Sequence, residues 1–446
     1  MSNRSLTGGM KVFFLILVGQ FVSLTGSGMT GFALGVWVYQ RTGSVTRFAL
    51  VSFFASLPGI LISPVAGALV DRYDRRRMMI LSDVGAGFCT LAMALLLWSA
   101  RLEMWLIYLF VALSSAFVAF QWPAHSAAIT LLVPKGQLGR ASGMVQTAQA
   151  AAQIIAPLLA GVLIVRPGVL GIMLIDVATF LFALFTLLAV RVPAPPEGAW
   201  EEGAPKGSLR REALYGWTYI RARPGLSGLL RFFFLTNFLM SLALVLISPM
   251  VLSFSTPVVL GVVLTFAGVG MLAGGVLMSV WGGPRRRIHG VLGFSAFQAL
   301  FMIVGGLRPS AALVAVAAFG FLFANAFVTG SSQALWQSKV APDVQGRVFA
   351  VRRMAAWAAM PLAYLVAGPL ADRVLAPLLA PGGALAGSVG RLIGVGAGRG
   401  IAFLFIVSGL LTLLLVLASY LHPRVRMVED ELPDALPEED AKPAPT

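Results

Sequence analysis

Long apolar blocks, separated by short charged breaks, dominate the chain. No charged residue occurs in 50–70, 107–133 or 232–284. A membrane-spanning helix needs about 20 apolar residues, so the last block must hold two spans. Backbone amides in lipid must be satisfied within their own segment, which makes helices the expected structure. The pattern predicts twelve spans, at roughly 11–38, 48–70, 78–99, 103–125, 141–165, 168–190, 230–253, 257–281, 290–307, 310–333, 354–371 and 400–421.

The composition supports an all-α integral membrane protein. Of 446 residues, 58% are hydrophobic and only 11% are charged, whereas a soluble domain carries about a quarter charged residues. The net charge of +15 does not indicate nucleic-acid binding, because the basic residues occupy the breaks between apolar blocks. The first block is too long for a cleavable signal peptide. The single cysteine, Cys89, excludes a disulfide framework and a cysteine-based metal site.

The basic residues also predict the orientation. With these spans, 25 of the 33 Lys and Arg residues fall in the termini and in loops on the same side as the termini. Cytoplasmic loops are the ones enriched in Lys and Arg. We therefore expect a multi-pass protein with both termini in the cytoplasm.

The organisation suggests two related halves. We expect six-helix bundles at 1–190 and 230–421, a cytoplasmic linker with an amphipathic helix at 191–229, and a disordered acidic tail at 422–446. A Val-Pro-Lys-Gly-Gln-Leu-Gly-Arg segment ends at Arg140 and a similar Ala-Pro-Asp-Val-Gln-Gly-Arg segment ends at Arg347, 207 residues later. Such repeats are typical of transporters with a midplane site between two parallel halves.

The loop after the second span carries the most specific motif. It reads Gly67-Ala-Leu-Val-Asp71-Arg72-Tyr-Asp-Arg75-Arg76-Arg. This resembles the G-x-L-x-D-R-x-G-R-R signature of the major facilitator superfamily, with Asp74 where the family often has Gly. The resemblance implies a major facilitator fold in which Asp71 locks the cytoplasmic side in the outward-facing state. The expected partner region begins at Arg347. The alternative is a loop that only sets topology through its positive charge.

The fifth span carries a second pattern of small residues. The sequence matches G-x8-G-x3-G-P-x2-G-G with Ala in place of several Gly, at Gly143, Ala152, Ala156-Pro157 and Gly161. It resembles the antiporter motif of exporting members of the superfamily and favours export. Small residues at this spacing also allow close helix packing, and Pro introduces a kink, so ordinary packing is the alternative. The stretch 368–373 repeats the Gly67–Arg72 pattern at the opposite membrane face, which makes Asp372 a candidate latch there.

Three blocks, Phe120-Gln-Trp-Pro-Ala, Leu138-Gly-Arg-Ala-Ser-Gly and Gly346-Arg-Val-Phe-Ala-Val-Arg-Arg-Met, resemble the branch that contains macrolide-efflux and enterobactin-export proteins. The resemblance extends to Leu421. It implies a bacterial inner-membrane exporter of small amphipathic molecules such as drugs, siderophores or secondary metabolites. The implied drive is a proton gradient, and we expect a monomer.

Polar groups at lipid depth are functional candidates. In the implied fold the first, fourth, seventh and tenth spans line the cavity, and the candidates there are Gln20, Ser23, Gln121, Asn237 and Asn325. Gln149 and Gln153 on the fifth span are further candidates to face it. Each of these is also a plausible helix–helix hydrogen-bonding group.

Acidic residues within the spans are the candidates for proton coupling. A buried carboxyl group can bind and release a proton in the working pH range, so Asp176 is the first candidate and Asp83 the second. Asp83 is also a candidate for a structural role near the basic loop. The first span lacks an acidic residue, which leaves the coupling mechanism open.

Other functions find little support. No Ser/His/Asp constellation, metal-ligand cluster or phosphate-binding loop occurs, so we expect no enzyme activity, cofactor or metal. An importer of a small nutrient and a lipid-handling membrane protein remain alternatives.

Overall fold

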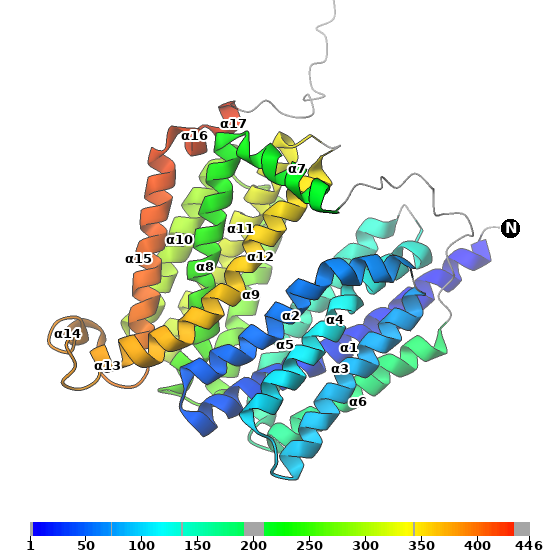
Figure 1. Ribbon diagram of the computed structural model, residues 1–446, viewed down its shortest axis with the longest axis horizontal. Helices are drawn as coiled ribbons and strands as arrows, with labels where there is room; N and C mark the ends of the chain where they lie inside the picture. Colours follow the sequence, from blue (N-terminus) through cyan, green and yellow to red (C-terminus); the bar gives the residue numbers. More distant parts are fainter. Residues whose placement is uncertain (1–2, 73, 135–136, 191–208, 342–343, 432–446) are drawn as a thin grey trace, which may run out of the picture.

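The computed structural model describes residues 3–72, 74–134, 137–190, 209–341 and 344–431 (Figure 1). Within these residues twelve helical spans are long and apolar enough to cross a membrane, as predicted, and none of the described residues forms a strand. The spanning helices are α1 (Asn3–Thr42), α2 (Val45–Arg72), α3 (Arg75–Trp98), α4 (Met104–Leu132), α5 (Leu138–Leu163), α6 (Gly168–Ala189), α8 (Pro224–Leu252), α9 (Pro257–Trp281), α10 (Arg287–Leu307), α11 (Ala311–Lys339), α12 (Gln345–Pro369) and α15 (Arg399–Leu421).

Helix ends follow from local chemistry. Asp74 caps α3, since its Oδ1 accepts a hydrogen bond of 2.8 Å from the backbone N–H of Arg77. Thr256 caps α9 in the same way, and Pro257 occupies the first turn, where its missing N–H costs nothing. Gly282 ends α9 with φ +74°, a conformation that favours glycine. Several helices run beyond the predicted spans because a helix continues after it leaves the apolar layer.

The chain forms two six-helix halves (Figure 1). The N half comprises α1–α6, and the C half comprises α8–α12 and α15. The amphipathic helix α7 (Leu209–Arg221) precedes the C half and packs on α12. We call the end where α1 begins and α7 lies the basic end, and the opposite end the far end.

Hydrophobic clusters show where the halves meet. At the basic end each half has its own buried cluster, around Met79 in the N half and Trp336 in the C half. A third cluster contains residues of both halves, including Phe48 on α2 and Ala367 on α12. Its N-half members come from the later part of α1, the first part of α2 and the end of α5. The described halves therefore pack together at the far end and lean apart toward the basic end (Figure 1).

The region after α12 differs from the expected end at 371. The helix continues through a π-helical turn, η2 (Leu370–Leu375), into α13 (Ala376–Leu378). A Gly-rich connection with the short helix α14 (Val389–Ile393) then leads to α15. The extension carries Asp372 on a helical turn at the far end.

The stretch that was expected to be a disordered tail also differs in its first residues. It contains α16 (Pro423–Arg426) and α17 (Val428–Glu431). The Glu429 carboxylate accepts hydrogen bonds of 3.0 Å from the backbone N–H groups of Arg287 and Ile288, at the start of α10. A carboxylate at a helix N-terminus is stabilising, which explains why this acidic segment packs on the C half. Residues 432–446 lie outside the described part.

Candidate functional site

The basic segment after α2 continues into the first turn of α3, which contacts the end of α6. The Arg76 guanidinium donates hydrogen bonds of 2.9 Å to the backbone oxygens of both Leu187 and Leu188, in the last turn of α6. A cation that binds the terminal carbonyls stabilises a helix C-terminus. The structure does not describe the surroundings of Gly67 or the side chains of Asp71, Arg72 and Arg75, so the gating role of these residues stays a prediction.

The arginines at the start of α12 have partners on α7 and α11. The Arg347 guanidinium lies 5.2 Å from the ring centre of Tyr215 on α7. Arg352 donates hydrogen bonds of 3.0 Å to Gln333 Oε1 and to Ser332 Oγ, both on α11. In this conformation the region expected to face Asp71 is thus held by α7 and α11.

Asp372 joins the two halves at the far end. Its carboxylate accepts hydrogen bonds from the backbone N–H groups of Val45 (3.1 Å) and Thr46 (2.8 Å). The hydroxyls of Ser44 (2.9 Å) and Thr46 (2.8 Å) also donate to it. One carboxylate of the C half therefore caps the N-terminus of α2 and links the two halves, while its role as a latch stays a prediction. Gly368, one turn earlier, lies against the backbone of Thr46, where any side chain would collide.

Helix α5 is packed closely on both sides. A Cβ at Gly161 would stand 2.9 Å from the backbone oxygen of Pro257 and 3.3 Å from Gly261 Cα on α9. On the other side, a Cβ at Gly28 of α1 would stand 2.8 Å from Ala156 Cβ. Ala152 and Ala156 are buried, whereas a Cβ at Gly143 would meet open space. The second half of the small-residue pattern thus forms close crossings, and Gly143 does not.

Asp83 and two predicted cavity residues form one polar cluster. Gln121 Nε2 lies 2.6 Å from Asp83 Oδ1 and 2.7 Å from Gln20 Oε1, and Gln20 Nε2 donates to Asp83 Oδ2 at 3.2 Å. The Asp83 side chain is 2% exposed. The cluster joins α1, α3 and α4 inside the N half.

Asp176 occupies a separate polar cluster in the same half. Its carboxylate accepts hydrogen bonds from the hydroxyls of Ser27 (3.3 Å), Thr90 (3.4 Å) and Thr179 (3.5 Å), and the residue is 1% exposed. Asp176 is nine residues into α6 from its far-end start, whereas Asp83 is nine residues into α3 from its basic-end start. Asp176 is thus nearer to the far end of its helix, and Asp83 is nearer to the basic end of its helix. Among the described residues, no Lys or Arg forms a salt bridge with either acid.

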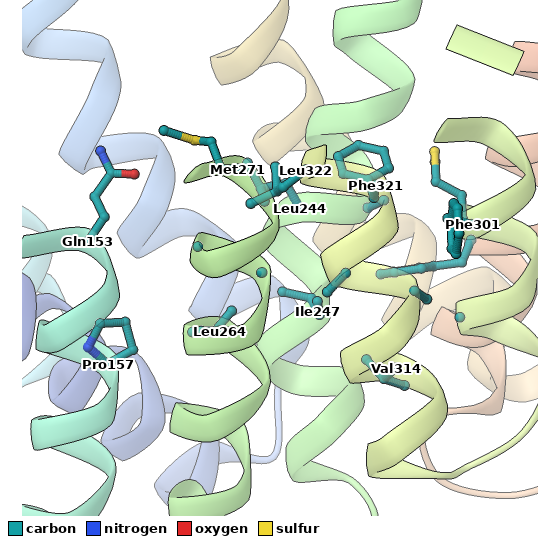
Figure 2. Close-up of a pocket in the computed structure, with 18 of the residues that line it drawn as sticks. Gln153, Pro157, Leu244, Ile247, Leu264, Met271, Phe301, Val314, Phe321 and Leu322 are labelled. Carbon is teal, nitrogen blue, oxygen red and sulfur yellow. The ribbon is translucent and has the colours of Figure 1, made fainter. Parts of the chain in front are cut away.

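An apolar pocket of about 250 Å³ lies between α5 and the interior of the C half (Figure 2). Its walls come from α5, α8, α9, α10, α11 and α15, and they include Met271, Phe301, Phe321 and Phe405. Of the 19 residues that line it, only Gln153 has a polar side chain. Figure 2 shows Gln153 and Pro157 on α5, across from Met271 and Leu264 of α9.

A second pocket, of about 470 Å³, lies between α1 and α5. It is lined by Leu24 and Gly28 of α1 and by residues of α5 that include Gln149. Gln153 and Pro157 border both pockets. The two pockets therefore meet at α5.

The five candidates on the first, fourth, seventh and tenth spans are not among the residues that line these two pockets. Gln20 and Gln121 hold Asp83, and the amide oxygen of Asn325 accepts a 3.2 Å hydrogen bond from Gln298 of α10. Ser23 is buried in α1, and Asn237 is half-buried in α8. The sequence did indicate Gln149 and Gln153. It gave no signal for Phe301 or Phe405, because an apolar residue in an apolar helix looks the same whether it faces lipid or a pocket.

Twelve spanning helices in two halves, with a pocket between α5 of the N half and the C half, are the architecture of a polytopic membrane transporter. The model of the Major Facilitator Superfamily matches residues 16–364. The chain therefore belongs to the major facilitator superfamily.

Similar proteins include efflux transporters. The chain is 28% identical over 368 residues to macrolide efflux protein A of Streptococcus pyogenes, which covers 81% of this chain and 90% of that protein. It is 25% identical over 384 residues to the multidrug efflux pump Tap of Mycobacterium tuberculosis, which covers 80% of this chain and 87% of that protein. A solved bacterial homologue of the human lysosomal transporter Spinster, inward-facing and unoccupied, has a TM-score of 0.69 at 15% identity, over 97% of this chain and 99% of that chain. This last likeness supports the fold alone.

Proposed function

We propose that the protein exports small amphipathic molecules, such as drugs, siderophores or secondary metabolites, across a bacterial inner membrane by alternating access. The observation that carries the proposal is the apolar pocket between α5 and the C half, which meets a second pocket of the N half at α5. The two halves pack together at the far end. The efflux proteins among its relatives favour export. The excess of Lys and Arg at the basic end favours a cytoplasmic position for that end and for both termini. The structure would then be the inward-facing state of a monomer.

Proton antiport is the drive that the buried acids support best. A carboxyl group inside a membrane protein is costly, so its presence marks a functional candidate. Asp176 and Asp83 both lie in the N half without a basic partner among the described side chains. Their partners are hydroxyls and amides, and both kinds of group can donate to a carboxylate or accept from a protonated acid. Each acid can therefore hold and release a proton without a charged neighbour.

In the outward-facing state, the basic loop would close the cytoplasmic end. Asp71, with Gly67 and the neighbouring Arg72, Arg75 and Arg76, would then face the start of α12 near Arg347. The arginines of α12 now contact α7 and α11, so closure requires an exchange of partners. Transport lost in Asp71→Asn, with membrane insertion intact, is the expected result; normal transport would remove the gating role.

The function is tested with inverted membrane vesicles that hold the full-length protein. Radiolabelled chloramphenicol, an uncharged amphipathic drug, should accumulate when the vesicle interior is made acidic, and a protonophore should abolish the uptake. Uptake that occurs only in right-side-out vesicles would contradict export. Uptake that ignores the proton gradient would contradict proton antiport.

The coupling acids are tested by Asp176→Asn, Asp83→Asn and the double variant. Matched controls are Glu103→Gln and Asp74→Asn, because both acids are exposed and Asn keeps the helix cap at position 74. We expect at least one buried variant to lose proton-driven uptake while the controls keep it. Proton-driven uptake by the double variant would exclude both acids as couplers.

A further inference from the structure

We infer that the two pockets at α5 form one bipartite binding site, in which the C-half pocket takes an uncharged apolar group and the glutamines of α5 bind a neutral polar group of the same molecule. The inference rests on the proposed function, because it specifies the class of molecule that the exporter carries.

The lining of the C-half pocket sets the chemistry of its ligand. None of the described residues that line either pocket is charged. Apart from Gln153, the pocket presents only aliphatic, methionine and aromatic side chains, proline and glycine. A charged or strongly polar group that entered it would lose its hydration without finding partners. The pocket therefore selects an uncharged alkyl or aryl group.

The volumes indicate how much of the ligand each pocket holds. A cavity of about 150 Å³ accommodates a benzene ring, so one of about 250 Å³ holds a substituted ring or a branched alkyl group. Sites for drug-sized molecules occupy roughly 300–1,000 Å³. The C-half pocket alone is too small for such a molecule, and the second pocket, of about 470 Å³, supplies the remaining space.

Gln153 links the two parts. It borders both pockets, and its side chain is exposed to them rather than packed in the bundle. Gln149 lies one helical turn earlier and faces the second pocket. An amide both donates and accepts hydrogen bonds, so the pair suits an amide, ester, hydroxyl or amine group without a net charge. A ligand that binds both parts lies across α5, next to the close crossing at Gly161.

Binding to the purified protein in lipid nanodiscs tests the inference without any transport. The probes are N-phenyl-1-naphthylamine and 1-anilinonaphthalene-8-sulfonate, which share an aromatic frame and differ by one sulfonate charge. We expect the neutral probe to bind at least about tenfold more tightly, since burying an unpaired charge costs more than the 1.4 kcal/mol that a factor of ten requires.

Two variants reduce the C-half pocket. Ala318→Phe adds a ring to its wall, and Leu244→Phe adds one at a residue that is 50% exposed and therefore tolerant of a larger side chain. Each should weaken binding of the neutral probe about tenfold, because overpacking costs 1–3 kcal/mol. Val316→Phe is the matched control, since Val316 lies on the same helix as Ala318 but is 58% exposed and lines neither pocket. Gln153→Leu keeps the side-chain size and should weaken the neutral probe by several-fold through the lost hydrogen bond.

The outcomes separate the inference from the function. Neutral-probe binding that is insensitive to Leu244→Phe and Gln153→Leu, in protein that remains monodisperse, overturns the bipartite site. Equal binding of the two probes overturns the uncharged class. If binding responds as expected but the vesicles show no export, the site stands and the proposed function fails.

Discussion

The far end and the basic end of the molecule are held together in different ways. At the far end the described contacts cross between the halves: Asp372 caps α2, Gly368 lies on Thr46, and Gly161 faces Gly261. At the basic end they stay within one half, as in the contacts of Arg76 with α6 and of Arg352 with α11. The difference teaches that closure of the far end depends on close backbone approach, on one carboxylate and on the apolar cluster that the two halves share.

Such a closed end suits a reversible interface. At the crossings of Gly161 and Gly368, small residues let the backbones approach without ordering long side chains. The Asp372 carboxylate adds one charged contact between the halves, at the N-terminus of α2. At the basic end, by contrast, the described partners of the arginines do not lie in the opposite half. The predictions below address these contacts in turn.

Gly161→Leu should have the largest effect. The new side chain would meet the backbone oxygen of Pro257 and the Gly261 backbone, which cannot rotate away as a flexible side chain would. Overpacking of this kind costs about 1–3 kcal/mol, so we expect the closed far end to be depopulated about tenfold or more and transport to fall accordingly. Distances between spin labels at positions 101 and 391, exposed far-end sites in the two halves, should lengthen.

Gly143→Leu is the control for this comparison. It belongs to the same motif and helix, but its Cβ would meet open space. It should leave both transport and the label distance near those of the parent protein. If both glycine variants behave alike, the close crossing at Gly161 is not what holds the far end closed.

The sequence predicted the fold well because the evidence for it is local. The length of each apolar block and the breaks between blocks determine the number of spans, and the twelve are confirmed. The internal repeat identified Asp372 in another way, because a motif that recurs at the opposite membrane face suggests a related contact. Boundaries were less accurate, as at η2, because nothing in the composition marks where a helix leaves the lipid.

The rotation of each helix about its axis could not be predicted. A span such as α4 is apolar on all sides, so its pattern does not reveal which face is buried. Gln20, Gln121 and Asp83 were therefore assigned separate roles, although the structure joins them in one cluster. Which side chains meet depends on how neighbouring helices pack. The same packing places Phe301 and Phe405 in the wall of a pocket.

Asp372→Asn should have an intermediate effect. Asn retains one acceptor for the α2 amides but loses the charge that the helix N-terminus stabilises, which is worth about 1 kcal/mol or about a fivefold shift in the conformational equilibrium. The label distance between positions 101 and 391 should shift toward longer values, and Asp372→Ala should shift it further. The exposed neighbour Arg373→Gln serves as the control. A far-end distance that is the same in all three variants would show that the carboxylate does not contribute to closure.

Arg76→Gln should have the smallest effect on closure, because its contacts lie within the N half. Loss of the two bonds to the last turn of α6 should lower the stability of that half by about 0.5–1 kcal/mol. Cys89 is the only cysteine and is buried in α3, so its reaction with a thiol-specific dye on heating reports unfolding of this half without an added label. The exposed Arg77→Gln should unfold as the parent does.

Arg76 also belongs to the motif expected to close the basic end, and two measurements separate the stabilising role from the gating role. A stabilising contact alone lowers the unfolding temperature and leaves transport per folded molecule unchanged, whereas a gating contact reduces transport at unchanged stability and shortens the time spent with labels at positions 140 and 337 close together.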